Sequence, residues 1–353
     1  MGSNNPSPSP SLSVLLFLII PFLVGVGGTT SPFSVDEFGA VGNGRADDTQ
    51  AFLDAWNVSC SSPTRTVLEI PAGKVYLVRP VNFVGPCNAK LKLVAISFYQ
   101  CKHLTMRNLT VTNSQKMHIA FFSSSHIRAS HMTVIAPADS PNTDGIHLNE
   151  SVSVVVKDST IRTGDDCISI VANSSDIRIR RIVCGPGHGI SIGSLGKAQA
   201  YDQVHNIRVD ECLITNTQNG VRIKSWQGGS GYARKIVFQN IWMKNVSNPI
   251  IIDQYYCDST TPCENQTMAV KMDDISFISI NGTSATKDAI RFACSDSFPC
   301  EKLFLKDIYL SLESGGPVAA YCWKATGHSS GLVYPLSCLS SAGDHGKQYY
   351  GSR

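Results

Sequence analysis

Acidic and imidazole side chains recur at a constant interval in the middle of this chain. Three similar six-residue segments start 22 residues apart, and the same position in each holds Asp144, Asp166 and His188. A fourth copy follows after 31 residues and has Asn219 at this position. Hydrolysis of a glycosidic bond needs one protonated carboxyl group, which gives the leaving oxygen a proton, and one carboxylate, which activates water. Asp144, Asp165 and Asp166 can supply both groups.

The electrostatics of such a group predict the conditions under which it works. A free Asp has a pKa of about 3.9, and several carboxylates in one patch do not all ionise easily. At least one of them should therefore keep its proton to higher pH, which suits mildly acidic conditions. Arg222 and Lys224 lie in the fourth copy with the same strand parity, so both side chains leave the core on one side. They are placed to hold a carboxylate of a substrate.

Each of these residue types also has an ordinary structural interpretation. An isolated acidic pair more often forms a solvated ladder or binds a cation, and here Arg222 and Lys224 would neutralise it. A single histidine at a glycine-rich turn, such as His188, is more often satisfied within the fold than catalytic. The constant interval favours the chemical interpretation, because it brings the same position of each segment to one place.

The elements that position these side chains are short strands in a repeat. Short β-branched runs cannot bury their apolar face alone, so neighbouring copies must stack as a solenoid. Parallel strands lie about 4.8 Å apart, so residues at one position form a ladder. A sandwich pairs its strands through hairpins and would not keep this interval, which favours a single-domain, all-β parallel β-helix. A second recurring string marks another strand in each coil: His103–Met106, His126–Ala129, Val152–Val155, Asp176–Ile179, Asn206–Val209, Lys235–Phe238, Asp274–Phe277 and Lys302–Leu305.

The two ends of the repeat have different patterns. Apolar residues at helical spacing, from Ala51 to Trp56, predict a short N-terminal capping helix. The preceding Asp47 and Asp48 are expected to accept N–H bonds of its first turn rather than to be catalytic. Farther upstream, the interrupted apolar run Leu12–Val26 is too short for a comfortable membrane span. We therefore expect residues 1–28 to be a secretory signal peptide and residues 29–353 to form one domain.

Composition agrees with export. The chain has twelve cysteines, and close pairs such as Cys257 with Cys263 and Cys294 with Cys300 suit disulfides. No Cys-x-x-Cys pair suggests zinc, and the formal charge of +3 is too small to favour nucleic acid. Asn-x-Ser/Thr sequons, which mark acceptors for glycosylation, occur at Asn57, Asn108, Asn149, Asn173, Asn245, Asn265 and Asn281.

The chain contains four segments in the order Asn142-Thr143-Asp144, Gly164-Asp165-Asp166, Gly187-His188-Gly189 and Arg222-Ile223-Lys224. These segments resemble the signature of the polygalacturonase family, and their surroundings resemble its plant branch from about Phe33 to Cys338. The resemblance implies a right-handed parallel β-helix that hydrolyses α-1,4 bonds between galacturonic acid units of pectin, with inversion and without a metal or other cofactor. It also implies a secreted cell-wall protein, monomeric and without stable membrane association, whose partner is homogalacturonan.

The same resemblance assigns roles to individual residues. Asp165 would be the general acid, and Asp144 and Asp166 would position and deprotonate the attacking water. His188 would steady the protonation of the acid. The substrate would be bound by Asn142, by Arg222 and Lys224 through its uronate carboxylate, and by the subsite tyrosine Tyr256. By family likeness, Cys167 and Cys184 would form a disulfide.

The sequence departs from the family between Cys87 and Cys101, where relatives carry at least one further coil. A partial deletion of a coil would leave strands out of register. One alternative is therefore a catalytically impaired pectin-binding protein. A second alternative is a calcium-dependent pectate lyase, which also uses a β-helix and acidic residues but abstracts a proton.

Overall fold

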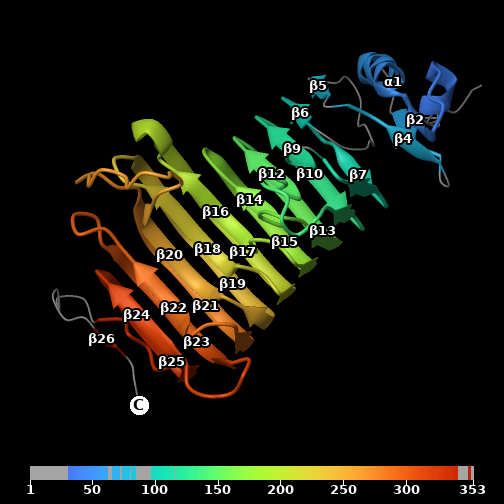
Figure 1. The fold of residues 1–353 in the computed structure, drawn as a ribbon. Coiled ribbons are helices and arrows are strands. Elements are labelled where there is room, and N and C mark those ends of the chain that lie inside the picture. The colour runs from blue at the N-terminus through green and yellow to red at the C-terminus, as the bar shows by residue number, and fades with distance from the viewer. Residues whose placement is uncertain are drawn as a thin grey trace, which may run out of the picture.

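The chain folds into a long stack of parallel strands with a helix at its N-terminal end (Figure 1). The computed structural model describes residues 31–62, 66–71, 74–79, 81–84, 97–114, 116–340 and 349–350. The expected signal peptide, residues 1–28, lies outside these ranges. Within them, no helix combines the length and the apolar character that a membrane crossing requires.

One sheet of the stack, here called the β12 sheet, runs nearly the whole length of the molecule. Its strands are parallel except for the last, β26, which pairs antiparallel with β24. In chain order it contains β5 (Asn82–Val84), β6 (Ser97–Tyr99), β9 (Ile119–Phe122), β12 (Ile146–Asn149), β14 (Ile168–Ile170), β16 (Ile190–Leu195), β18 (Asn219–Trp226), β20 (Asn248–Tyr256), β22 (Asp288–Ala293), β24 (Ala319–Trp323) and β26 (Tyr349–Tyr350).

The other long sheet, here called the β13 sheet, takes the strands that lie between them in the chain. Each coil therefore contributes to both sheets, as a β-helix requires. This sheet contains β7 (Thr105–Arg107), β8 (Thr110–Thr112), β10 (Ser125–Ser130), β11 (Thr133–Ile135), β13 (Val152–Arg162), β15 (Ser174–Cys184), β17 (Tyr201–Thr215), β19 (Ser230–Val246), β21 (Lys271–Ser284), β23 (Cys300–Leu312) and β25 (Ala325–Tyr334). The predicted parallel β-helix is confirmed.

Residues facing the interior stack on their own kind from coil to coil. Ile146 is aligned with Ile168, which is aligned with Ile190, and all three side chains are fully buried. Aromatic rings do the same near the other end, where Phe238 and Phe277 stack with centroids 5.4 Å apart. One connected apolar core extends in this way from Val35 to Cys338. Because alternate residues of a strand point to opposite faces, the residues between them face outward.

Corners within or just before the strands of the β13 sheet use left-handed backbone. Each of the eight strings of the second kind that were predicted from the sequence has a residue of positive φ at its first or second position. This conformation is uncommon outside glycine and bends the chain locally. The residues are His103, His126, Ser153, Asp176, Asn206, Lys235, Asp274 and Lys302, with φ between 53° and 60°.

The N-terminal cap consists of short elements around one helix. They are β1 (Ser31–Ser34), the 3₁₀ turn η1 (Val35–Phe38), β2 (Asn43–Asp47), α1 (Thr49–Ser61), β3 (Thr66–Glu69) and β4 (Val75–Leu77). Trp56 of α1 is 1% exposed, and its ring lies 4.9 Å from the ring of Phe83 and 5.9 Å from that of Phe98. The predicted capping helix is confirmed, because its tryptophan covers the open end of the apolar core.

The expected role of the Asp pair before the helix is only half right. Asp47 Oδ1 accepts a hydrogen bond from Thr49 N at 3.1 Å, as predicted. Asp48 occupies the N-cap position, but its carboxylate accepts none from the helix. It accepts hydrogen bonds from Val41 N at 2.6 Å and Gly42 N at 3.3 Å instead, because the preceding turn folds back over it.

Strands on either side of the shortened segment pair in register. Phe83 of β5 is aligned with Phe98 of β6, and Phe98 is aligned with Phe121 of β9. Residues 85–96, which connect β5 to β6, lie outside the described residues. The loss of register expected from a partial deletion is therefore wrong for these three strands.

Disulfides fasten turns along the stack. Cys167–Cys184, Cys257–Cys263 and Cys294–Cys300 form as expected, and Cys322–Cys338 is a further bond. Cys101 and Cys212 are buried free thiols, and burial raises the pKa of each to about 12.

Candidate active site

The predicted site residues come together beside three adjacent strands of the β12 sheet. Asp144, Asp166 and His188 each precede a strand by two residues, namely β12, β14 and β16. The bends that carry them are tied to one another, because Gly145 N donates to Asp166 O at 2.9 Å and His188 N donates to Asp165 O at 2.8 Å. The sequence interval has therefore become a spatial ladder.

Glycine is required where these bends pass close to the next coil. A Cβ atom on Gly189 would lie 2.0 Å from the carbonyl oxygen of Asn219, and the residue has a φ of +87°. At Gly145, a Cβ atom would lie 2.6 Å from the carbonyl oxygen of Cys167. Only glycine fits such backbone contacts, so these positions fix the distance between successive site residues.

Asp166 is a buried carboxylate between two cations. Its side chain is 2% exposed, and Oδ1 lies 2.8 Å from Arg222 Nη2 while Oδ2 lies 3.1 Å from Lys224 Nζ. Ser191 Oγ donates a further hydrogen bond to Oδ1 at 2.6 Å. A buried charge needs such compensation. The shared strand parity of Arg222 and Lys224 thus leads both side chains to Asp166, as in the neutralising interpretation left open above.

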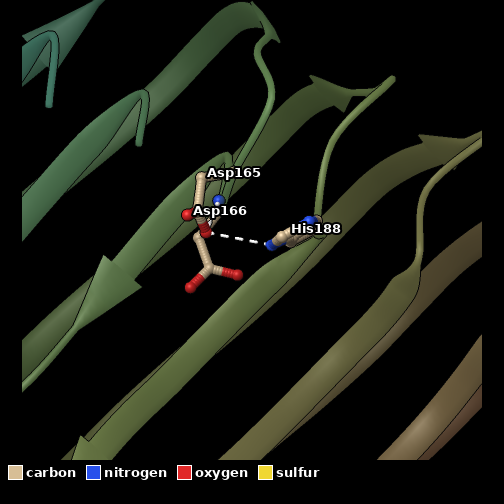
Figure 2. A group of neighbouring side chains, drawn as sticks. All are labelled: Asp165, Asp166 and His188. Atoms are coloured by element: carbon tan, nitrogen blue, oxygen red, sulfur yellow. Dashed lines mark hydrogen bonds and ion pairs between the residues drawn. The ribbon is translucent and has the colours of Figure 1, made fainter. Parts of the chain in front are cut away.

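Asp165 is hydrogen-bonded to His188 (Figure 2). The distance from His188 Nδ1 to Asp165 Oδ1 is 3.0 Å, and Asp166 N donates to the same oxygen at 2.8 Å. Burial raises the pKa of Asp165, but the hydrogen bond and charge of His188, the Asp166 N–H and the charge of Lys224 outweigh it. The pKa of Asp165 therefore lies below its ordinary value.

Asp144 has the opposite shift. Burial and the negative charges of Asp166 and Asp165 raise its pKa to about 7, although Ser169 Oγ donates a hydrogen bond to Asp144 Oδ2 at 2.6 Å. Asp144 and Asp165 thus differ in proton affinity, as crowding predicts. In the free site, Asp144 therefore holds a proton more tightly than Asp165 does. The family resemblance instead makes Asp165 the acid.

Three polar residues of the site were not predicted from the sequence. His147 Nδ1 lies 2.8 Å from Ser169 Oγ, and Ser191 contacts Asp166. Strand parity is the signal that was missed, since His147, Ser169 and Ser191 are aligned with Arg222 on one outward face.

The two remaining predicted residues flank this group. Asn142 contacts Asp165 through its backbone, with N donating to Oδ2 at 3.2 Å. The ring of Tyr256 lies 5.2 Å from Lys224 Nζ and 5.4 Å from the ring of Trp226. Each of the eight predicted site residues therefore lies in one continuous group on this face.

A cation site is the other chemistry that this group offers. Oxygen and nitrogen atoms of Asp165, Asp166 and His188 lie within 4.8 Å of one another. Calcium prefers oxygen ligands that are free to surround it. Arg222 and Lys224 already neutralise Asp166, so a calcium ion at this place would face two positive charges. This arrangement disfavours the lyase alternative.

Residues 87–331 match the family model described as "Glycosyl hydrolases family 28". A protein of Arabidopsis thaliana named "Probable polygalacturonase" is 45% identical over 371 residues, covering 87% of this chain and 84% of that protein. A polygalacturonase of Malus domestica is 40% identical, covering 81% of this chain and 76% of the relative.

Solved structures agree on the fold. The exopolygalacturonase of Thermotoga maritima has a TM-score of 0.67 at 14% identity, covering 91% of this chain and 94% of that chain. The polygalacturonase of Erwinia carotovora has a TM-score of 0.61 at 20% identity, covering 76% of this chain and 91% of that chain. These likenesses establish the right-handed parallel β-helix. By its sequence, the chain belongs to glycosyl hydrolases family 28, together with the plant polygalacturonases that it resembles over most of its length.

Proposed function

We propose that this protein hydrolyses the α-1,4-galacturonosidic bonds of polygalacturonate, with inversion at the anomeric carbon. The observation that carries the proposal is the group of three carboxyl groups on one outward face, in which Asp144 and Asp165 have opposite pKa shifts. Inverting hydrolysis needs a proton donor and a proton acceptor on opposite sides of the bond that breaks. Family membership and the names of the relatives support polygalacturonate as the substrate.

Asp165 is the proton donor in this proposal. Its side chain is 20% exposed, against 12% for Asp144 and 2% for Asp166, so it is the carboxyl group that a bound sugar reaches most easily. Asp165 must carry a proton to act as the acid, although its pKa is low in the free site. The negative charge of a uronate bound beside it raises the pKa of Asp165. His188 holds the carboxyl group in place through its hydrogen bond.

Asp144 is the general base, and Asp166 helps to position the water. A base works best when its pKa lies near the pH of the reaction, and the pKa of Asp144 is raised to about 7. In the step, Asp165 transfers its proton to the glycosidic oxygen as the C–O bond breaks. Water adds to the anomeric carbon from the opposite face and gives its proton to Asp144. The products are two shorter chains, and solvent returns the proton from Asp144 to Asp165.

Matched aspartate variants test these roles. Reducing-end release from de-esterified polygalacturonate is measured at mildly acidic pH, with a chelator present, for the parent, Asp165→Asn, Asp144→Asn and the exposed control Asp139→Asn. Loss of the acid or the base should lower turnover by about 10²–10⁴-fold, and the control should keep the parent rate. The anomer that forms first, read by NMR, reports inversion or retention.

A second substrate separates acid from base. An aryl galacturonide with a good leaving group needs little protonation, so Asp165→Asn should recover much of its rate on it and Asp144→Asn should not. The reverse result would exchange the two roles. Unsaturated products that require calcium would establish a lyase, and polymer binding without any release by the parent would establish an impaired binding protein.

We further infer that the protein is secreted to the cell wall and acts there as a monomer on homogalacturonan. The four disulfides between described residues suit an oxidising export route. The apolar run within residues 1–28 supports removal of a leader. N-terminal sequencing of the secreted protein tests the cleavage, and its elution volume in size-exclusion chromatography tests the oligomeric state.

A further inference from the structure

A cleft opens on the β12 sheet, beyond the group of carboxylates toward the C-terminal end. Its volume is about 470 Å³, and residues of β20, β22 and β24 form most of its walls. None of its residues was predicted from the sequence as part of a site. The lining residues are Asp253, Tyr255, Arg291, Ala293, Tyr321 and Trp323.

The cleft continues the outward face of the catalytic group. Arg222 is aligned with Ile251 on the next strand, and Ile251 with Arg291 on the strand after that. Arg222 and Arg291 are thus two strand spacings apart, or about 10 Å along the stack. Two pyranose units laid end to end span a similar length, so one polymer chain can lie along both positions.

Arg291 differs from the cations of the catalytic group in its partners. Arg222 and Lys224 both form ion pairs with Asp166. Arg291 is exposed, and its guanidinium carbon lies 5.2 Å from the ring centroid of Tyr321. Within the described part of the chain, no acidic side chain forms an ion pair with Arg291.

The acids near the cleft are occupied elsewhere. Asp253 accepts a hydrogen bond from Tyr255 N at 2.9 Å, and burial raises its pKa although the charges of Arg291 and Arg222 oppose this. Asp296 accepts hydrogen bonds from Tyr255 Oη and Trp323 Nε1, both at 3.1 Å. These bonds fix two aromatic side chains as walls and leave the guanidinium of Arg291 available.

We propose that this cleft is a second carboxylate-binding subsite, in which Arg291 binds the free carboxylate of a galacturonate unit about two units along the chain from the one beside Arg222. A guanidinium binds a carboxylate through two parallel N–H···O bonds, and a methyl ester lacks the charge that strengthens them. Tyr321 and Trp323 offer apolar ring faces to the sugar. The subsite rests on the proposed hydrolysis and makes it selective for substrate that is not esterified at this unit.

Oligogalacturonates of increasing length test the subsite. Catalytic efficiency, kcat/KM, is measured for the parent and Arg291→Gln on chains from two to seven units. The variant should equal the parent on chains too short to reach the cleft and be about tenfold less efficient on longer ones. Arg291→Lys should fall between them, because lysine keeps the charge but not the paired geometry. Arg178→Gln, an exposed arginine of the β13 sheet, is the matched control and should leave every chain unaffected.

Binding separates this proposal from the proposed catalysis. In an Asp165→Asn background, calorimetry with a seven-unit oligogalacturonate should show about tenfold weaker binding when Arg291→Gln is added. Equal binding with and without Arg291→Gln would overturn the subsite, and so would an equal loss of efficiency at every chain length. Absence of reducing-end release by the parent would overturn hydrolysis, while the binding comparison would still decide the subsite.

Discussion

Asp144 and His147 belong to one hydrogen-bonded chain through Ser169, and their pKa values move in opposite directions. Burial raises the pKa of Asp144 to about 7 and lowers that of His147 to about 4. Both shifts favour the neutral form, since the low-dielectric surroundings penalise either charge. In the free site, the chain from His147 through Ser169 to Asp144 is therefore neutral over the mildly acidic range, and Asp144 becomes the proposed base only after its proton has passed to Asp165.

Opposite shifts have opposite effects on stability as pH changes. Between about pH 4 and pH 7, folded Asp144 keeps a proton that the unfolded chain has lost, so its contribution to the free energy of unfolding falls as pH rises. Between about pH 4 and pH 6.5, unfolded His147 holds a proton that the folded form lacks, so its contribution rises with pH. The two effects largely cancel in the parent.

Removing one partner should expose the effect of the other. As pH rises from 4 to 6.5, the free energy of unfolding of Asp144→Asn should increase relative to that of the parent, by on the order of 3 kcal/mol. That of His147→Gln should decrease relative to the parent by a similar amount. Urea unfolding at several pH values measures both. Curves for the variants that stay parallel to the parent across this range would contradict the assigned shifts.

At this scale the sequence predicted the acids better than the residues that tune them. Asp144, Asp165, Asp166 and His188 stand out because their types recur at one interval. Ser169 was passed over, because a serine in a strand carries no chemical signal by itself. The sequence also could not tell whether Arg222 pairs with Asp166 or binds substrate. The answer depends on distances, which strand parity alone does not give.

At the scale of elements, a corner residue such as Lys302 bends a strand of the β13 sheet without ending it. Lys302, at the start of the second string on β23, has a φ of +53° and an exposed side chain. Left-handed backbone costs an ordinary residue about 1–2 kcal/mol, and Asn tolerates it better than most. The side chain at such a corner should therefore affect stability through the backbone.

Substitutions at Lys302 should separate backbone from side-chain effects. Lys302→Val should lower the free energy of unfolding by about 1–2 kcal/mol, because a β-branched residue resists positive φ, whereas Lys302→Asn should leave it equal or higher. Lys306 on the same strand does not have a positive φ, so Lys306→Val should be nearly neutral. Equal losses for both valine variants, measured by thermal unfolding, would argue against corner strain.

The strands themselves were well predicted, because their strings repeat with alternating apolar residues. The corner conformation was not, since His103, Ser153 and Lys235 share no residue type that marks positive φ. Asp48 was assigned to the helix for its position before the first turn, which is sound local chemistry. The turn at Val41 and Gly42 competed for its carboxylate, and a contact across that turn has no local sequence signal.

At the scale of the whole molecule, each coil is held mainly by its two neighbours, so an end is the natural place for unfolding to start. Trp56 closes one such end against Phe83 and Phe98. The strands that follow remain in register across the shortened segment. The small number of residues in this segment raised the expectation that strands on its two sides would be out of register. Register depends on which strand residues are aligned, and Phe83, Phe98 and Phe121 are aligned.

Loosening the cap should therefore have a local effect. Trp56→Ala should cost about 3–5 kcal/mol at the N-terminal end, as large aromatic deletions from a core do, and Trp56→Phe should cost less. Hydrogen exchange should speed up in α1, β5 and β6 and stay slow in β14 and β16, with turnover nearly unchanged at room temperature. Uniform loss of protection along the stack would show that the cap supports the entire molecule.

The two buried thiols bear on how long the disulfide pattern of this molecule lasts. Disulfides rearrange when a thiolate attacks them, and the raised pKa values of Cys101 and Cys212 keep both groups protonated at mildly acidic and neutral pH. The folded stack thus protects its own bond pattern from internal exchange, and scrambling of these bonds begins only after the coils around the thiols have opened.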